Sequence, residues 1–335
     1  MELKPTPPED AKKRYLKEKR TYVSDKTLYN YTTALDQFVD WLIDNGYYSL
    51  SDVDSDVIDQ FKEYRLQNVK PITARNDMRT VKNFIEFCES IQAVPVGLNE
   101  LIRIPKVKEE DEICDDILGR DEAQSILSHL SKFDYASNRH VTILLLWKCG
   151  MRIGGLRALD VNDFDEGRPA IEIRHRAEKG TPLKRKANSE RDVIITPEVA
   201  EVVADYIENN RPAVTDDYGR EPLIATRQGR AARTTITRHV YTATRPCFHN
   251  GGSCPFDENP ETCEATKWNK SSQCPGSVSP HALRRGYVTA ARNAGQPKDV
   301  TGERVNMSGN ILDKHYDHGS VEEKAERRRD FVKDI

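Results

Sequence analysis

The sequence contains no long apolar run. Its most apolar stretch extends from Val141 to Trp147, far short of the roughly 20 residues with which a helix crosses a membrane. The amino-terminal segment, MELKPTPPEDAKKRY, also lacks the apolar centre of a secretory signal. We therefore expect a protein without membrane contact in the reducing cytoplasm, where its seven cysteines are thiols or metal ligands rather than disulfides.

Neither sign of charge dominates, because the chain has 51 Lys and Arg residues and 54 Asp and Glu residues, which give a net charge of −3. Bulk positive charge is therefore not what would attract a nucleic acid. Cations gather locally instead: residues 174–191 hold seven Lys or Arg and two acids, and residues 222–250 hold five Arg and no acid. Such stripes can neutralise phosphates at short range, and they are equally compatible with two solvated faces.

The chain lacks the fixed period of a repeat protein, and its 335 residues are about twice the usual length of one domain. Apolar residues recur at helical spacing over residues 28–42, 57–66 and 81–88. Ser24 and Gly46 are placed to cap and to end the first of these segments. The pattern predicts a helical domain over residues 1–107.

Prolines and the charged run KVKEEDE then interrupt the periodicity, which predicts a linker over residues 108–119 and a second domain over residues 120–335. Helical patterns in this domain cover residues 122–131, 140–148, 198–208, 235–244, 281–293 and 310–316. Two short strands, at residues 170–174 and 193–196, flank a basic loop. The predicted fold class is therefore mainly α with a small antiparallel β-sheet (α+β).

Residues 247–274 read as an insertion, with little periodicity and four of the seven cysteines. Cys247, Cys254, Cys263 and Cys274 are separated by six, eight and ten residues, without the C-x-x-C spacing typical of zinc sites. One interpretation is a structural zinc ion that folds a segment without a core, with His249 as a substitute ligand. The other is four unlinked thiols.

Three segments of the second domain carry side chains suited to phosphodiester chemistry without a metal. CGMRIGGLRALD presents Arg152 at a turn, SPHALRRG places His281 and Arg284 on one helix face, and LDKHY ends in Tyr316. Planar guanidinium groups match phosphate oxygens. A phenol, with a pKa of about 10, becomes a nucleophile beside cations and a base, for which His281 is the candidate, and a lysine of the basic loop can protonate the leaving 5′ oxygen.

The order of these segments resembles the catalytic domain of the tyrosine recombinases, or phage-type integrases, over about residues 120–329. The SPHALRRG and LDKHYDH strings are most similar to archaeal and archaeal-virus members. The first domain is similar in size and character to the helical core-binding (SAM-like) domain of that family. The resemblance implies that Arg152 is the first catalytic arginine, that His281 and Arg284 form the family's H-x-x-R, and that Tyr316 is the nucleophile.

The family's catalytic lysine has three candidates here, Lys179, Lys184 and Lys186. We prefer Lys184, because the segment TPLKRK precedes Arg191 and the strand DVII much as the family's lysine precedes its next strand. This choice makes Lys184 the expected general acid.

Two positions depart from the family pattern. The glutamate that usually follows the first arginine is Gly155 here, so another group must orient Arg152. The His or Trp about nine residues before the nucleophile is Met307, whose side chain cannot hydrogen-bond a phosphate as those residues do. Tyr287 carries the nearest alternative hydroxyl to that of Tyr316. It follows Arg284 on the same helix, and we expect its side chain to pack against other residues rather than to act as the nucleophile.

The resemblance implies a site-specific recombinase or integrase of a virus or mobile element that cuts and rejoins DNA through a 3′-phosphotyrosyl intermediate. It implies no catalytic cofactor, so any zinc would be structural, and double-stranded DNA as the partner. It also implies a monomer in solution, a tetramer on DNA, and a location in the cytoplasm at the nucleoid, or in the host cytoplasm if viral. Residues 321–335 are either a segment that docks on a neighbouring copy or a solvated last helix.

Two other functions stay open at this point. A type IB-like topoisomerase would use the same chemistry to relax DNA without exchanging strands. A DNA-binding regulator that has lost its activity would account for Gly155 and Met307.

Overall fold

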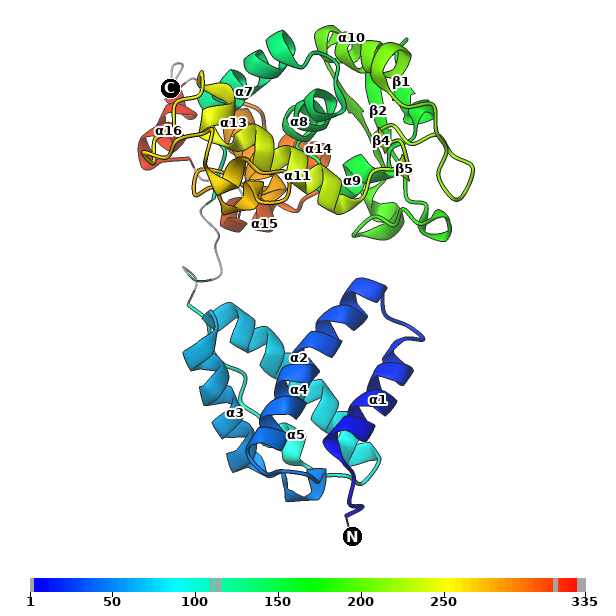
Figure 1. Ribbon diagram of the computed structural model, residues 1–335, viewed down its shortest axis with the longest axis vertical. Helices are drawn as coiled ribbons and strands as arrows, with labels where there is room; N and C mark the ends of the chain where they lie inside the picture. The colour runs from blue at the N-terminus through cyan, green and yellow to red at the C-terminus, as the bar shows by residue number, and fades with distance from the viewer. Residues whose placement is uncertain (1–2, 109–110, 112–115, 316–318, 330–335) are drawn as a thin grey trace. The chain divides into compact units, whose positions relative to one another are not determined.

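The computed structural model describes residues 3–108, 111, 116–315 and 319–329. The chain divides into two compact units, Met1–Cys114 and Asp115–Ile335 (Figure 1). Helices dominate both units, and the strands all belong to the second. The predicted fold class, mainly α with a small antiparallel sheet, is confirmed. None of the helices in the described ranges is long and apolar enough to span a membrane.

Over residues 3–108, the first unit is a bundle of four helices and one short helix. They are α1 (Pro8–Lys19), α2 (Asp25–Asp44), α3 (Ser55–Asn68), α4 (Pro71–Ser90) and α5 (Leu98–Leu101). Local chemistry sets their ends: the Ser24 hydroxyl accepts the Thr27 N–H at the start of α2, and Asp54 accepts two N–H groups at the start of α3. Gly46, with φ +85°, follows α2. The three helices predicted here are confirmed.

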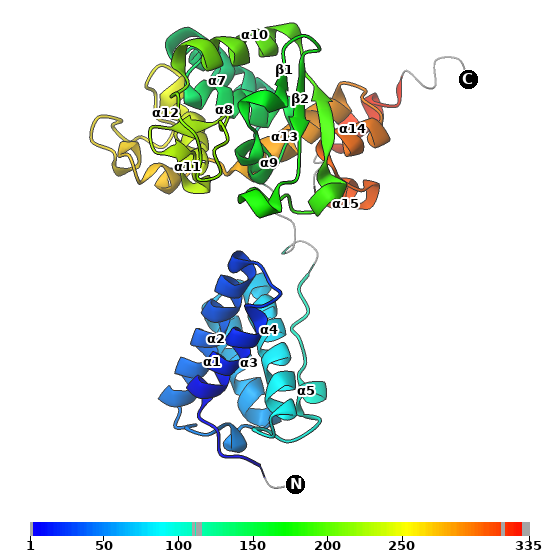
Figure 2. The same ribbon diagram turned by 90° about the vertical axis from the view of Figure 1, so that its right-hand side faces the viewer.

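Helices α1 to α4 pack together in the first unit (Figure 2). Aromatic rings form the centre between them. Phe38 and Phe61 are fully buried, with ring centroids 4.9 Å apart, and Tyr15 of α1 meets Phe84 edge-on at 5.6 Å. Helix α1 was not predicted, because its sequence PEDAKKRYLKEK offers few apolar residues at helical spacing. Burial of Tyr15 in this aromatic cluster supplies the stabilisation that its own pattern lacks.

The second unit is built around α8 (Asn138–Cys149), which is buried on almost every side and packs against α7, α10, α11 and α13. Its helices besides α8 are α7 (Arg120–Phe133), α9 (Ile153–Ala158), α10 (Pro197–Asp205), α11 (Arg233–Thr244), α12 (Pro246–His249), α13 (Pro280–Asn293), α14 (Lys298–Val305), α15 (Gly309–His315) and α16 (Val321–Glu326). The predicted helices correspond to α7, α8, α10, α11, α13 and α15. The sequence did not predict α9 and α14, two short helices whose ends carry the site described below.

A small antiparallel sheet completes the second unit. Its strands are β1 (Phe164–Asp165), β2 (Ala170–Ile173) and β3 (Arg191–Ile194), in the order β1-β2-β3, and β4 (Ala225–Thr226) and β5 (Gly229–Arg230) form a separate pair. Ile171 lies opposite Val193 in the register and both are buried, whereas Glu172 lies opposite Asp192 on the face with the charged side chains. Alternation of this kind fixes which face meets the core.

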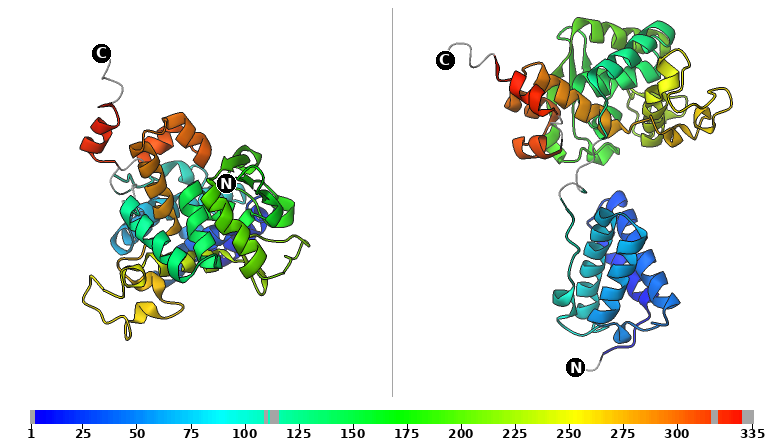
Figure 3. Two further views of the ribbon diagram at one scale, coloured as in Figure 1. Left: turned by 90° about the horizontal axis from the view of Figure 1, so that it is seen from above. Right: turned by 90° about the vertical axis from the view of Figure 1, so that its left-hand side faces the viewer.

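The predicted insertion, residues 247–274, lies against α11 and extends from the body of the second unit in both views of Figure 3. It contains α12 and two 3₁₀ turns. Polar contacts hold it there: Thr242 and Ser271 share a hydrogen bond of 3.0 Å, and Arg245 donates to the Ala265 carbonyl at 2.8 Å. The insertion is therefore attached by hydrogen bonds to a helix of the core.

Buried ion pairs connect the end of α9 to the sheet and to the β4–β5 pair. The guanidinium of Arg230, only 5% exposed, donates to both Asp160 and Asp216. Arg176 donates to Asp163 through two nitrogens, and Arg220 donates to Asp160 and Asp216. Buried charges are tolerated because Asp160 and Asp216 each have more than one arginine donor, and Asp163 accepts from two nitrogens of Arg176 and from the Asp160 N–H.

Replacing Arg230 by methionine is expected to lower the free energy of unfolding of the second unit by about 3–5 kcal/mol, because Asp160 and Asp216 then lose a principal donor while still buried. Unfolding in urea, followed by circular dichroism, measures the loss. Arg168→Met, at an exposed ion pair with Asp192, is the matched control and should leave the midpoint unchanged. Equal effects of the two substitutions would contradict the prediction.

The same network predicts sensitivity to acid. Burial by itself raises the pKa of Asp216, but hydrogen bonds from Arg230 and from the backbone N–H groups of Arg220 and Tyr218 lower it to about 2. Since this folded pKa lies below the ordinary 3.8, the carboxylate stabilises the fold fully above about pH 4. That contribution is lost as the pH falls from about 4 to 2.

Candidate active site

Arg152 lies at the turn between α8 and α9. Gly150 ends α8 in the left-handed conformation, where a Cβ would come within 2.3 Å of the Tyr287 ring, so the close approach of α13 requires glycine. Arg152 is then the residue that caps α9, with extended backbone. Its Nη1 donates to the carbonyl of Asn306 at 3.3 Å.

Arg284 lies on α13, which Pro280 begins. Its side chain is almost fully buried, and the residue is 1% exposed. Nη1 donates to the carbonyl of Gly150 and Nη2 to that of Val305 at 2.6 Å. One guanidinium thus joins the end of α8 to the end of α14.

Three arginines converge on three consecutive carbonyl groups at the end of α14. Arg191 Nε donates to Arg304 at 2.7 Å, Arg284 to Val305, and Arg152 to Asn306. We call residues 304–306 the carbonyl turn. The last carbonyls of a helix lack partners within it and carry partial negative charge, which suits them to hold cations. Gly155 stands at the position where the family usually has a glutamate. The Asn306 carbonyl is thus a group that can orient Arg152 in place of that glutamate.

His281 stands one turn before Arg284 on α13, and part of its surface remains exposed while the rest is shielded from water. Loss of water around its ring, followed by the charges of nearby cations, lowers its pKa from 6.5 to about 4. These cations are Arg285, Arg284, Arg152 and Lys184. Charges have such an effect only over short distances. The predicted residues Arg152, Lys184 and Arg284 therefore lie near His281 in the structure. His281 is neutral at physiological pH.

In the DNA-free protein, the ring of His281 is expected to be mostly neutral at pH 5, where an ordinary histidine is mostly protonated. Lys184→Ala should raise the pKa of His281 by removing one nearby cation, and Lys179→Ala, the matched control, should not change it. Side-chain NMR of the histidine rings between about pH 3.5 and 8 measures both, with His281→Gln to assign the signal. A midpoint near 6.5, or equal effects of the two lysines, would contradict the placement.

Lys184 lies in the loop between β2 and β3, and we call residues 181–190 the lysine loop. Ahead of Lys184, the Leu183 N–H donates to Nδ1 of His175 at 2.9 Å. After it, Arg185 and Asn188 both bond to Asn306 of the carbonyl turn. The exposed side chain of Lys184 is therefore carried by a backbone that is held on both sides.

Tyr316 lies outside the described residues, so its position relative to the cations is not part of the structure. It directly follows α15, which Leu312 anchors in a buried cluster with Val288, Val305 and Met307. Met307 is 7% exposed. The structure therefore gives Met307 an apolar packing role at the position where many family members carry a polar ligand.

Comparisons with known proteins agree with this geometry. A sequence model described as the phage integrase family matches residues 116–318. The chain belongs to the phage integrase family. It is a tyrosine recombinase, an enzyme that transfers DNA strands at specific sites. A search of curated proteins finds no match.

Solved structures are similar in fold to this integrase. The Tn1549 transposon integrase in complex with transposon right end DNA has a TM-score of 0.64 at 15% identity and covers 98% of this chain and 100% of its own. A lambda integrase dimer bound to a COC′ core site has a TM-score of 0.63 at 14% identity, over 94% and 100%. A lambda integrase tetramer bound to a Holliday junction has a TM-score of 0.63 at 13% identity, over 94% and 79%.

The two basic stripes of this integrase have mixed roles. Arg176 and Arg230 are tied to buried aspartates, and Arg174 pairs with Glu172 and Asp192 at the sheet. These arginines therefore stabilise the fold. Lys184 and Arg233 are exposed, and a phosphate backbone can reach side chains of this kind.

The zinc prediction for the integrase insertion is not supported. All four of its cysteines are described, and the described residues contain no group of three or more His, Cys, Asp or Glu side chains that could hold a metal ion. The six described cysteines of the chain are free thiols. The four in the insertion are distributed along a segment that polar contacts already hold on α11, which explains how it can be ordered without a shared ion.

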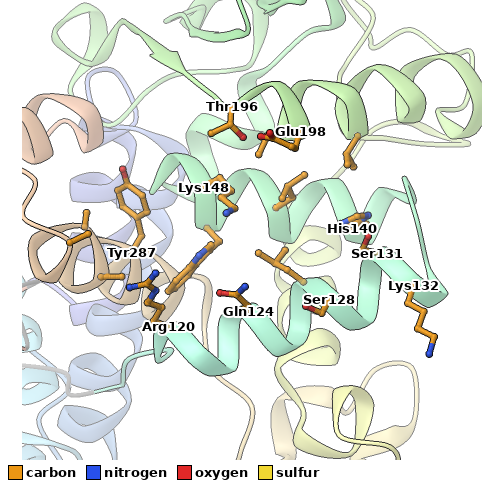
Figure 4. A pocket seen from close by; sticks show the side chains of 18 residues that line it. Arg120, Gln124, Ser128, Ser131, Lys132, His140, Lys148, Thr196, Glu198 and Tyr287 are labelled. Atoms are coloured by element: carbon orange, nitrogen blue, oxygen red, sulfur yellow. The ribbon is translucent and has the colours of Figure 1, made fainter.

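A separate cavity of about 810 Å³ opens between α7, α8, α10 and α13 of the integrase (Figure 4). Its lining combines apolar side chains of α8 and α10 with polar side chains such as Gln124, Ser128 and Lys148, which Figure 4 labels. Arg152, Lys184, His281 and Arg284 do not belong to this lining. The cavity is therefore distinct from the predicted catalytic residues.

Proposed function

We propose that this integrase cuts and reseals DNA with Tyr316 as its nucleophile, and with Arg152, Lys184, His281 and Arg284 acting on the scissile phosphate. The observation that carries the proposal is the carbonyl turn. It holds Arg152, Arg191 and Arg284 against the segment that ends, ten residues after Asn306, at Tyr316. Tyr316 is therefore close along the chain to the turn that holds these arginines, whose charges would stabilise the transition state.

The chemistry follows from the charges. Tyr316 Oη attacks phosphorus, the P–O5′ bond breaks, and the products are a 3′-phosphotyrosyl ester and a 5′ hydroxyl. The phenolic proton passes to neutral His281 and on to water, and Lys184 donates a proton to the departing O5′. Arg152 and Arg284 bind the non-bridging oxygens, on which negative charge grows. The ester retains the bond energy, so attack by another 5′ hydroxyl reseals the strand without ATP.

The biological setting is also part of the proposal. Integration or excision of a virus or mobile element fits a strand transferase of this family. The SPHALRRG and LDKHYDH strings favour the archaeal or archaeal-virus branch. Such an enzyme acts on DNA in the cytoplasm, at the nucleoid or in an infected host cell.

We further propose that both units bind double-stranded DNA, with residues 1–107 as the core-binding domain, and that four copies assemble on paired sites. The fold relatives named above include a lambda integrase tetramer on a Holliday junction and a Tn1549 integrase on transposon end DNA, which supports this assembly. Residues 321–335 are the proposed docking segment between copies; α16, within them, is exposed.

Covalent trapping tests the proposal. Duplexes that bind the full chain are selected from a random pool and rebuilt with a nick near each candidate phosphate, so that the short 5′-hydroxyl fragment diffuses away after cleavage. We expect a covalent adduct on a denaturing gel, attached through a 3′ phosphate to Tyr316 by peptide mass spectrometry. Absence of an adduct from every selected duplex would sink the enzymatic proposal. Equal trapping on unselected duplexes would favour the topoisomerase alternative.

A further inference from the structure

Asn306 ends α14 in the left-handed conformation, with φ +52°. Its own N–H bonds back to the Glu303 and Gly302 carbonyls, and the Met307 N–H donates to Gly302 at 2.8 Å. Asparagine adopts this conformation more readily than most residues, and glycine adopts it freely. The backbone of the turn therefore does not depend on what the asparagine side chain contacts.

The side chain of Asn306 nevertheless makes two specific bonds, both to the lysine loop. Its Nδ2 donates to the carbonyl of Asn188 at 2.8 Å, and its Oδ1 accepts from Nη1 of Arg185 at 3.3 Å. The carbonyl of the same residue accepts from Arg152. One residue thus joins the first catalytic arginine to the residues that follow Lys184.

We infer that Asn306 is a positioning residue, which sets the place of Lys184 by tying the lysine loop to the carbonyl turn. The inference rests on the proposed function of Lys184 as the general acid. A lysine has a long flexible stem, and its usefulness as an acid depends on where its backbone is held. The bond from Leu183 to His175 fixes the loop ahead of Lys184, and Asn306 fixes it behind.

The arrangement also couples the acid to the nucleophile. Asn306 stands ten residues before Tyr316, and its carbonyl turn already holds the three arginines. The side-chain bridge adds the lysine loop to the same turn. The lysine loop is thereby attached to the same turn that holds the three arginines and that precedes Tyr316 in the chain. Efficient proton transfer requires such fixed relative positions.

The test separates the bridge from the backbone. Asn306→Gly preserves the left-handed turn and removes both side-chain bonds. Single-turnover cleavage is measured on a trapping duplex with the normal bridging 5′ oxygen and on one with a bridging 5′ sulfur. A thiolate, whose conjugate acid has a pKa of about 8.5, leaves without a general acid. We expect Asn306→Gly to slow cleavage of the oxygen duplex about 10- to 100-fold and of the sulfur duplex less than about 3-fold.

A double-mutant cycle adds a second measurement. Lys184→Ala should also cleave the oxygen duplex slowly and the sulfur duplex at close to the wild-type rate. Adding Asn306→Gly to Lys184→Ala should not slow cleavage of the oxygen duplex further, since both substitutions affect the same proton transfer. Asn306→Asp, which retains an acceptor for Arg185 but loses the donor to Asn188, should lie between wild type and Asn306→Gly.

Three results would overturn the inference: a wild-type rate for Asn306→Gly on oxygen, equal slowing on both duplexes, or full additivity with Lys184→Ala. Circular dichroism and the thermal midpoint check folding, and Asn306→Asp replaces Asn306→Gly in every comparison if the latter does not fold. Failure of wild type to form an adduct on either duplex would instead refute the proposed function, so the two failures are distinguishable.

Discussion

Tyr316→Phe is expected to abolish the covalent protein–DNA adduct and to slow strand cleavage by at least about 10⁴-fold. The substitution removes a single oxygen. The cationic groups that would receive the phosphate, Arg152 and Arg284, keep their bonds to the carbonyl turn. Binding of DNA should therefore survive, and a gel-shift assay beside the trapping assay separates loss of chemistry from loss of binding.

The matched control is Tyr287→Phe. Burial raises the pKa of Tyr287 even though Arg304 acts in the opposite direction, so its hydroxyl is less available as a phenolate than an ordinary one. Its ring packs over Gly150, where a Cβ would approach it to 2.3 Å. Tyr287→Phe should keep the adduct. An adduct that persists in Tyr316→Phe and disappears in Tyr287→Phe would show that the nucleophile is misassigned.

Arg152→Lys is expected to slow cleavage about 10²- to 10³-fold while leaving DNA binding nearly intact. Lysine keeps the charge but not the planar pair of donors that can hold a phosphate oxygen and a carbonyl together. Arg152 suits this test because it caps a short helix and is only partly buried. Arg284 is 1% exposed and bonds to two carbonyls, so its substitution would change stability as well as rate.

Single-turnover rates at saturating protein measure this loss without a contribution from affinity. Arg168→Lys, at an exposed ion pair on the sheet, is the control and should cleave at the wild-type rate. If Arg152→Lys retained full activity, the positive charge alone would be sufficient, and the proposed need for a planar pair of donors would be wrong. A parallel drop in the control would point to general loss of DNA contacts.

Much of the fold could be predicted because its signals are local. Repeated apolar spacing and a capping serine are properties of neighbouring residues, and α2 begins after Ser24 as predicted. Helix α8 was predicted from its apolar run, since nearly all its residues face the core. Helix α1 was not predicted, because Tyr15 is stabilised by Phe84, a residue far along the chain.

The zinc interpretation, one of two that the sequence left open, is not supported by the described residues. Four cysteines in a segment of little periodicity suggest a shared ion, but spacing alone does not bring side chains together. The contacts that hold the insertion run from Thr242 and Arg245, within and directly after α11, to Ser271 and the Ala265 carbonyl. Neither a hydroxyl pair nor a backbone acceptor leaves a distinctive sequence pattern.

Part of the candidate site could likewise be predicted from the sequence, and part could not. Side-chain types in order along the chain were enough to identify Arg152, His281, Arg284 and Tyr316 as candidates, because guanidinium, imidazole and phenol groups have few substitutes in phosphodiester chemistry. The choice of Lys184 from three lysines rested on its place before a strand. The positive charge of Lys184 helps to lower the pKa of His281, so the two side chains are close in space. This proximity supports the choice of Lys184 in a way that the order of residues could not.

The sequence by itself determined the family, the class of fold and the candidate chemical groups, because these depend on residue type and on spacing over one or two helical turns. The tertiary structure decided what orients those groups. Arg152 bonds to a carbonyl 154 residues away, and every residue carries a carbonyl, so no residue type marks the carbonyl turn. Its role arises from the close approach of α8, α13 and α14, which only the folded chain brings about.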